Sequence, residues 1–406
     1  MDSLIIAAAR ALAAGDPIGA LKRVALRDDA PALALRGIAM AQLGDFARAR
    51  VLLKRARRSF SPKEAVARAR CLVAEAEIAL VSRDLAWSAK SLDAARATLS
   101  AHGDHDNAAH AHYLEIRRML LIGRIDDAER ALDELDPASL TLMLRTVHEL
   151  VAFGIAVRRL DTASARAAIG RARRAVRDAG IPALEAEVES ASLVLTSPAA
   201  RLVARGEEQP LLLAEVESLF ASTALVVDAC RHLVRRRDGI VSLATRPVLF
   251  ALARALAEAW PDDVARDVLI ARAFGSKFTD ESHRARLRVE VARLRTKLRG
   301  LAEVSATDRG FMLTPRTKSD VVVLARPVEE EHATVLAFLY DGESWSSSAL
   351  ALALGASQRT VQRALDSLAA AGKVQAFGRG RARRWMTPPI PGFTTTLLLP
   401  GAVPID

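Results

Sequence analysis

Cysteine is almost absent from the chain. Its 406 residues contain only Cys71 and Cys230, which do not form a Cys-x-x-Cys pair, so neither a disulfide framework nor a zinc finger is indicated. Apolar runs of the ~20 residues that span a bilayer are also missing. The start of the chain carries Asp2 and lacks the basic region of a signal peptide. We therefore expect a cytoplasmic protein without a membrane partner.

Aromatic residues are scarce as well, at 4% of the chain with only two Tyr. Ala, Leu, Val and Arg dominate instead, which favours closely packed helices joined by short loops over β-sandwich cores. The length is sufficient for roughly two to four domains. These features predict a mainly α protein built from several domains.

Motifs that carry catalysis are missing. The sequence has no glycine-rich phosphate loop, no Gly-x-Ser-x-Gly turn and no acid–base pair placed by a motif. We expect no enzymatic activity and no cofactor. A cluster of possible metal ligands contains His102, Asp104, His105, His110 and His112. Its spacing matches no zinc motif. We interpret it as a solvated loop between helices and predict no metal site.

Positive charge is abundant. Lys and Arg number 58 against 48 Asp and Glu, which gives a net charge of +10 and a pI near 10.2. Such an excess favours a polyanionic partner, because cationic side chains release counterions from nucleic acid. An Arg-rich composition has this charge without any such partner, so the distribution of the basic residues has to decide.

Residues 1–195 consist of amphipathic segments separated by Gly-Asp, Pro or Asp-rich turns. The clearest unit runs from Pro31 to Pro62 and has small and large residues in the order Gly37, Gly44, Phe46, Ala49, Leu53 and Ala56. This unit resembles a tetratricopeptide repeat, and weaker copies surround Gly15 and Gly123. The resemblance implies an α-helical solenoid that forms a homodimer or binds a protein or small-molecule effector. A helical spacer that only dimerises is the alternative.

Residues 196–325 change in pattern. Short β-like runs at 201–205, 211–216, 225–227 and 233–234 precede an Asp238-Gly239 turn and a strand at 240–243. Three helices are predicted at 246–260, 264–274 and 282–299, with Asp262 and Asp263 as candidate N-caps of the second. A hairpin at 304–313 follows.

This order is carried by LVVDACRHLVRRRDGIVSLATRPVLFALARAL, RVEVARLRTKL and VSATDRGFML. It resembles the OmpR/PhoB class of winged helices, an α+β fold in which the third helix enters the major groove of DNA. The resemblance implies that Arg293 and Arg295 contact DNA. The outward basic residues of the predicted third helix and its hairpin form our candidate site, namely Arg284, Arg288, Arg293, Arg295, Lys297 and Arg309. A solvated basic face is the alternative.

Two departures from that class stand out. The hairpin is one residue shorter than is usual and carries Asp308 near its tip, which argues against insertion into the minor groove. The N-terminal half also lacks the alternating strands and helices of a receiver domain. Control by aspartyl phosphorylation is therefore not expected.

Residues 326–389 predict a second winged helix. Helices at about 330–340, 346–354 and 357–370 are followed by a hairpin at 373–386, and the segment SQRTVQRALDSLAAAGKVQAFGRGRARRW is similar to winged helices of the MarR and DeoR type. Val361, Leu365 and Leu368 are predicted to face the core. The candidate DNA-binding residues are Gln358, Arg359, Gln362, Arg363, Arg379, Arg381 and Arg383. A module used only for dimerisation is the alternative, and residues 390–406 are predicted to form a C-terminal arm.

Together these patterns predict a mainly α protein in which a tetratricopeptide-like solenoid precedes two winged-helix domains. The function we expect is that of a sequence-specific regulator of transcription that binds double-stranded DNA in the bacterial nucleoid. Two rivals remain open. One is an adaptor that grips a protein partner with its solenoid and uses the winged helices for protein contacts, and the other is a nucleic-acid-processing enzyme.

Overall fold

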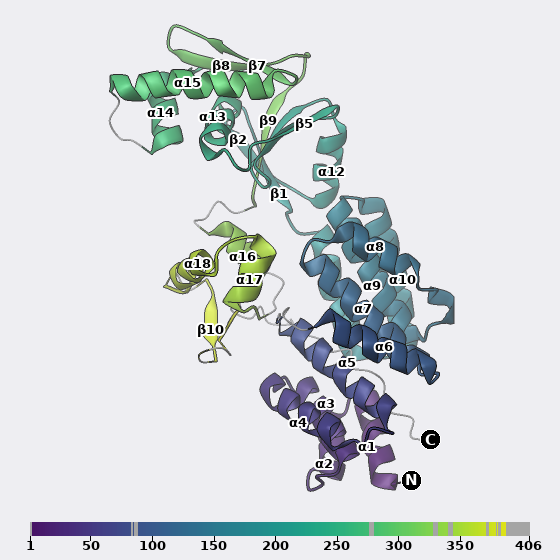
Figure 1. Cartoon of the computed structure of the whole chain (residues 1–406). Helices are drawn as coiled ribbons and strands as arrows, with labels where there is room; N and C mark the ends of the chain where they lie inside the picture. The colour runs from purple at the N-terminus through teal and green to yellow at the C-terminus, as the bar shows by residue number, and fades with distance from the viewer. Residues whose placement is uncertain are drawn as a thin grey trace. The chain divides into compact units, whose positions relative to one another are not determined.

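The computed structural model describes residues 2–82, 84, 88–275, 280–327, 332–339, 344–370, 373–378, 380 and 383–386. Helices make up 64% of the chain and strands 13%, so the prediction of a mainly α protein is confirmed. The chain forms two compact units, Met1–Ser192 together with Glu331–Asp406, and Leu193–Glu330 (Figure 1).

Helices that follow one another in sequence pack against one another in the first unit. Acidic N-caps begin many of them: the side chains of Asp2, Asp16, Asp29, Asp45 and Asp161 each accept a backbone N–H of the first turn. The helices are α1 (Ser3–Ala13), α2 (Pro17–Val24), α3 (Ala30–Gln42), α4 (Phe46–Ser59), α5 (Ala65–Val81), α6 (Ala89–Ala101), α7 (His105–Leu121), α8 (Ile125–Asp133), α9 (Leu142–Arg159), α10 (Thr162–Ala179) and α11 (Pro182–Ser192).

Helices α3 and α4 approach each other closely at Gly37. A Cβ placed there would lie 2.8 Å from Cγ of Leu53 and 3.3 Å from the carbonyl oxygen of Ala49. Gly44, in the turn between the two helices, has φ +83°, a conformation that favours glycine. The small residues at these two positions are therefore set by backbone geometry and packing.

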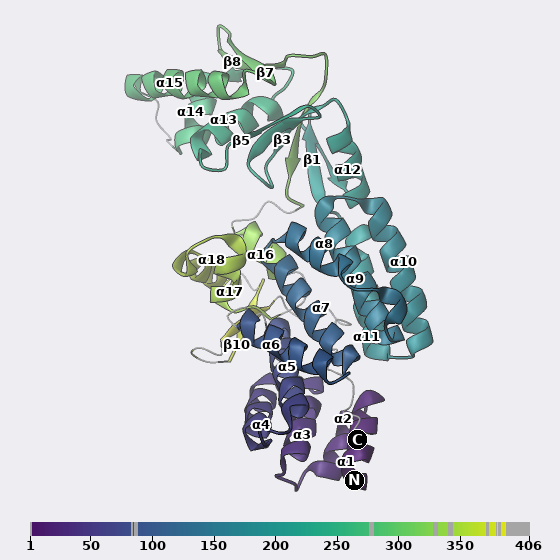
Figure 2. The same cartoon turned by 45° about the vertical axis from the view of Figure 1, so that its right-hand side comes forward.

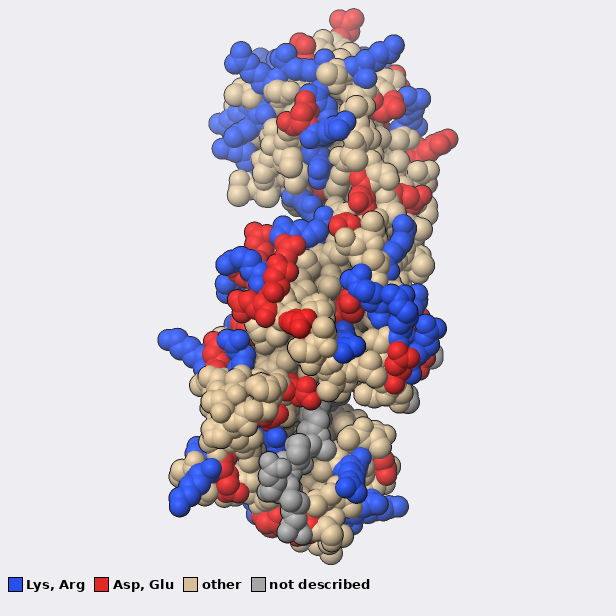
Figure 3. Space-filling view, turned by 90° about the vertical axis from the view of Figure 1, so that its right-hand side faces the viewer, with Lys and Arg blue, Asp and Glu red and all other residues tan. Residues whose placement is uncertain are grey.

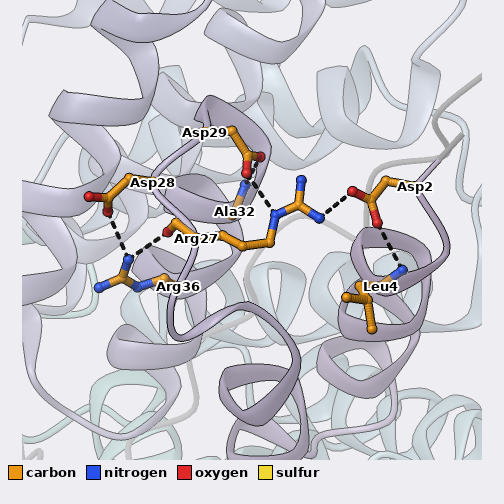
Figure 4. A network of polar contacts seen from close by, with 7 residues as sticks. All are labelled: Asp2, Leu4, Arg27, Asp28, Asp29, Ala32 and Arg36. Carbon is orange, nitrogen blue, oxygen red and sulfur yellow. Dashed lines mark hydrogen bonds and ion pairs between the residues drawn. The ribbon is translucent and has the colours of Figure 1, made fainter.

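An ion-pair network ties the first helices together (Figure 4). The guanidinium of Arg27 lies between Asp2 and Asp29, with Nε 2.7 Å from the Asp29 carboxylate. Arg36 donates to the carbonyl of Arg27 at 2.8 Å and to Asp28 at 3.2 Å. The hydrogen bond from Arg27 lowers the pKa of Asp2. All these groups are partly exposed, so the network orients the turn more than it stabilises the unit.

The described C-terminal residues, which end at Met386, belong to the same unit. They contribute α16 (Ala333–Leu339), α17 (Ser347–Leu354) and α18 (Gln358–Ala370), and the strand pair β10 (Gln375–Phe377) and β11 (Arg384–Met386). The predicted helices and hairpin of this segment are confirmed. Ser357 caps α18 as expected, because its hydroxyl accepts the N–H of Thr360 at 3.1 Å.

This C-terminal segment lies beside α5, α6 and α7 (Figure 2). It shares an apolar core with these helices. Leu80 and Leu99 belong to the same buried cluster as Trp345, Leu365 and Trp385. The backbones of the two tryptophans also exchange hydrogen bonds of 2.7 and 2.8 Å. The segment that the sequence predicts as a second winged helix is thus built onto the N-terminal helices.

The second unit is organised around a six-stranded sheet of order β2-β1-β9-β3-β4-β5. Strand β9 pairs parallel with β3 and antiparallel with β1, so it joins the β1–β2 hairpin to the three antiparallel strands β3, β4 and β5. The strands are β1 (Ala200–Ala204), β2 (Glu207–Leu211), β3 (Leu225–Asp228), β4 (Leu233–Arg236), β5 (Gly239–Ser242) and β9 (Val321–Ala325).

One predicted β-like run is wrong. Residues 213–221 form helix α12 (Leu213–Ala221), where the sequence suggested extended chain at 211–216. The Glu215 carboxylate accepts the N–H of Leu212 at 2.7 Å and begins the helix. Leu213 and Val216, three residues apart, are buried on one helical face.

Three helices and a small sheet complete the second unit and confirm the predicted order. They are α13 (Pro247–Glu258), α14 (Arg266–Phe274) and α15 (Glu281–Leu298), with β6 (Val264–Ala265), β7 (Ala302–Ala306) and β8 (Gly310–Pro315) in the order β6-β8-β7.

The predicted N-caps of α14 are wrong. Val264 and Ala265 pair with β8 as a strand, so α14 begins only after Ala265. Asp263 instead accepts a hydrogen bond from the hydroxyl of Thr307. Its carboxylate therefore fixes the β7–β8 turn.

The close approach at Gly37 leads to a stability prediction. Gly37→Val should destabilise the α3–α4 pair by ~1–3 kcal/mol, the usual cost of overpacking. Gly170→Ala in α10 is the matched control, because its Cβ would meet only Nη1 of Arg174, at 4.0 Å. That change should stabilise its helix by about 0.5–1 kcal/mol. Native-state hydrogen exchange of residues 30–59 and 162–179 measures both effects, and equal protection of α3 in Gly37→Val and the parent chain would contradict the packing argument.

Candidate nucleic-acid interface

Helix α15 presents its basic residues because its apolar residues are held on the other side. Leu287, Val291, Leu294 and Leu298 are at most 1% exposed and form the stripe that the sequence predicts. Asp280 caps the helix by accepting the N–H of His283 at 2.8 Å. Because the stripe is buried, the remaining faces of α15 lie at the surface.

A hollow of about 670 Å³ lies beside α15, bounded by the start of α14 and by the β7–β8 hairpin. Arginines from all three elements line it, against only two carboxylates, Asp267 and Glu281. The arginines are Arg266, Arg284, Arg288, Arg295 and Arg309. Five cations and two anions leave three positive charges around the hollow, so it is suited to an anionic ligand. On the face of the molecule drawn in Figure 3, Lys and Arg side chains gather over residues 193–330.

Two of these arginines also hold the hairpin in place. Arg266 donates to the carbonyls of Asp308 and Thr307 at 2.8 and 3.0 Å. Arg295 donates through Nε to the carbonyl of Val304 at 2.6 Å. Both guanidinium groups therefore fix the distance between the helices and the hairpin, and they also contribute positive charge to the hollow.

Gly310 makes the close pairing of β6 and β8 feasible. A Cβ at this position would lie 1.8 Å from the carbonyl oxygen of Val264, so no side chain fits. Its N–H donates to the hydroxyl of Thr307 at 2.9 Å. The glycine closes the turn and brings Arg309 to the rim of the hollow.

The other arginines of the hollow are weakly held. Arg288 pairs with Glu281 at 2.7 Å and Arg309 with Asp263 at 3.7 Å, and both guanidinium groups are largely exposed. Exposed pairs of this kind contribute ~0–1 kcal/mol and exchange readily for another anion. Arg284 has no acidic partner within the described part of the chain. These three cations are therefore available to a ligand.

Two predicted residues of α15 are not brought to the hollow. Arg293 and Lys297 are exposed but lie on other faces of the helix. Each residue turns an α-helix by about 100°, so Arg293 points about half a turn away from Arg284. Arg293 pairs with Glu290 at 2.7 Å instead. The candidate site thus separates into the hollow and an opposite basic face.

Arg266 is the member of the hollow that sequence reasoning missed. It is the first residue of α14, where a basic side chain is not favoured by the helix dipole. That anomaly, in a turn next to a predicted hairpin, is the signal that was present in the sequence.

A second surface is formed by α18. Val361, Leu365 and Leu368 are buried as predicted, and Arg359 and Arg363 are exposed. The two glutamines are already engaged: Gln358 donates to the hydroxyl of Ser347 at 3.2 Å and Gln362 to the carboxylate of Asp366 at 3.0 Å.

The hairpin beside α18 is described only in part. Arg383 lies with its guanidinium 4.3 Å from the ring centroid of Trp385 and 3.9 Å from Asp366. Arg379 and Arg381 lie outside the described residues, as does the predicted arm at 390–406. Arg359 and Arg363 are therefore the candidate residues of this surface that have no acidic partner in the described chain.

The interpretation of the histidine cluster as a solvated loop is wrong, because His105, His110 and His112 lie in helix α7. The cluster also does not converge on one point. His110 is buried and its Nε2 lies 3.0 Å from the carboxylate of Glu77, whereas Asp104 accepts hydrogen bonds from Arg70 and Asn107. Burial raises the pKa of Glu77. Among the described residues no group of three or more His, Cys, Asp or Glu side chains is arranged to hold a metal.

The cysteines offer no nucleophile. Both are free, and burial raises the pKa of Cys71 to about 12 and that of Cys230 to about 11. Each thiol is therefore protonated at neutral pH.

Comparison with protein-family models, curated proteins and solved structures found no match to this chain. Within the described residues, no helix combines the length and the apolar character required to cross a membrane.

The hairpin contacts of Arg266 can be tested directly. Arg266→Ala removes two hydrogen bonds from a charged donor, so the free energy of opening the turn should fall by about 1–2 kcal/mol. Faster amide exchange in residues 304–313 is the expected result. Arg284→Ala, which loses a charge but no hairpin contact, is the control and should leave that exchange unchanged. Equal exchange in both variants would show that Arg266 does not hold the hairpin.

Proposed function

We propose that the chain is a sequence-specific regulator of transcription that binds double-stranded DNA and acts in the cytoplasm, at the nucleoid. The observation that supports this most is the hollow between α15 and the β7–β8 hairpin, with its five arginines. A helix and a hairpin that share a basic hollow match the two parts of a winged helix that grip a duplex. The strands β3 to β5, the three helices and the hairpin of residues 225–315 follow the order expected of an OmpR/PhoB-like module.

The dimensions of α15 suit the major groove. An α-helix with its side chains is about 10–12 Å across, and the groove is about 12 Å wide. The exposed side of α15 carries the small or slim residues Ala285, Val289 and Ala292 between its arginines. The helix can therefore enter the groove while Arg284 and Arg288 reach phosphates or guanine edges.

A second DNA contact through α18 would add specificity. Arg359 and Arg363 project from its exposed face, one helical turn apart. Two modules on one chain raise the effective concentration of the second contact once the first is made. In this proposal the N-terminal helices form the tetratricopeptide-like part of the protein, which carries α18 and provides dimerisation or effector binding.

Binding to duplex DNA should depend steeply on salt. We expect the double variant Arg284→Ala/Arg288→Ala to bind at least tenfold more weakly, and the slope of log K against log salt to decrease by about two, one for each lost phosphate contact. Fluorescence anisotropy with a labelled duplex at several salt concentrations measures both quantities.

Arg173→Ala/Arg174→Ala in α10 is the matched control, because it removes the same charge from two exposed positions of the other unit. The control should retain most of the affinity and the original slope. Equal losses of DNA affinity in the two double variants would show that the affinity depends only on net charge. Binding to DNA without any salt dependence would contradict the proposal and favour the adaptor function.

The α18 surface generates a prediction about sequence preference. Arg359→Ala should reduce the ratio of specific to random-sequence affinity by about fivefold or more, since a bidentate contact to a base discriminates by ~1–3 kcal/mol. The preferred site is first selected from a random duplex library with the parent chain. If Arg359→Ala weakens binding to both duplexes equally, Arg359 contacts only the backbone.

A further inference from the structure

A small cavity of about 170 Å³ lies among α5, α7, α9 and α11 of the first unit. It is distant in sequence from every residue of the proposed DNA interface, and it is not explained by that function. An apolar cavity of about 150 Å³ admits a molecule of the size of benzene. The cavity therefore suits a ligand no larger than a single amino acid.

The walls of the cavity are mainly aliphatic. Leu120, Val147 and Val151 are buried side chains along it, and Leu150 is partly exposed. Gly154 keeps the space open, because a Cβ there would lie 3.3 Å from Cδ1 of Leu120. A branched aliphatic group is the natural complement of these walls.

The lining of the cavity also carries charges of both signs. Arg117 donates through Nη2 to Oε1 of Glu187 at 2.9 Å, and Arg158 also lines the cavity. The side chains of Arg117 and Glu187 are 27% and 20% exposed, so both charged groups remain accessible to a ligand in the cavity.

We propose that this cavity binds an α-amino acid with a branched aliphatic side chain, such as leucine. The ammonium and carboxylate groups of an α-amino acid are attached to the same carbon, so they require an anion and a cation side by side. Glu187 and Arg117 provide that pair, with the Glu187 carboxylate accepting from the ammonium group and the Arg117 guanidinium donating to the carboxylate of the ligand. The aliphatic side chain fills the space above Gly154. This inference does not depend on DNA binding.

The ligand series tests the proposal on the unmodified full-length chain. Isothermal titration calorimetry is carried out with leucine, with 4-methylpentanoate, which lacks the ammonium group, and with 3-methylbutylamine, which lacks the carboxylate. We expect leucine to bind, and each of the other two to bind at least tenfold more weakly. If leucine does not bind at millimolar concentration, or if 4-methylpentanoate binds as tightly, the proposal is overturned.

A pair of variants locates the site. Glu187→Gln keeps the size of the side chain but removes the charge that faces the ammonium group, and it should weaken leucine binding at least tenfold. Glu185→Gln, an exposed neighbour on the same helix, is the control and should bind as the parent chain does. Equal affinity in Glu187→Gln and the parent chain would place leucine elsewhere. DNA binding measured on the same samples reports independently on the proposed function.

Discussion

The burial of one apolar stripe on α15 determines the chemistry of the second unit. Leu287, Val291, Leu294 and Leu298 share a core with α13 and the sheet. Burying four such side chains stabilises the unit by several kcal/mol, at roughly 1.5–3 kcal/mol for each, far more than any exposed ion pair on this helix contributes. The rotation of α15 is therefore fixed by its leucines, and the positions of its arginines follow from that rotation.

The arginines around the hollow then divide into two kinds. Arg266 and Arg295 donate to backbone carbonyls of the hairpin, so part of their hydrogen-bonding capacity is used to hold the fold. Arg284, Arg288 and Arg309 are exposed and have weak or no acidic partners in the described chain. Gathering like charges in one hollow is unfavourable for the free protein, and an anionic ligand relieves that repulsion. The binding of an anion therefore explains this group of arginines better than a contribution to the stability of the fold does.

Periodicity explains which parts of this architecture are predictable from sequence. The spacing of Leu287, Val291 and Leu294 predicts the buried face of α15, and the Asp308-Arg309-Gly310 turn predicts the hairpin, because both signals are local. The contacts of Arg266 with Thr307 span more than forty residues and have no local signal. Helix α12 was missed for the opposite reason, since a short apolar run is compatible with a strand until Glu215 is recognised as its cap. The separation of Arg293 from Arg284 was open to prediction, because it needs only the helical angle.

Long-range packing also explains why the C-terminal segment was predicted as a separate domain. The stretch from Val361 to Leu368 has an apolar face of ordinary helical spacing, which does not reveal what covers it. In the structure that face joins the buried cluster of α5, α6 and α7.

Leu80 belongs to this cluster and also lines the cavity proposed for an amino acid, and Leu121 lines the cavity and packs against the same cluster. Close-packed side chains transmit small displacements, because an interior without voids cannot absorb them. The cavity proposed for an amino acid therefore borders the same packed core that positions α18, and the two are joined through apolar contacts within one unit.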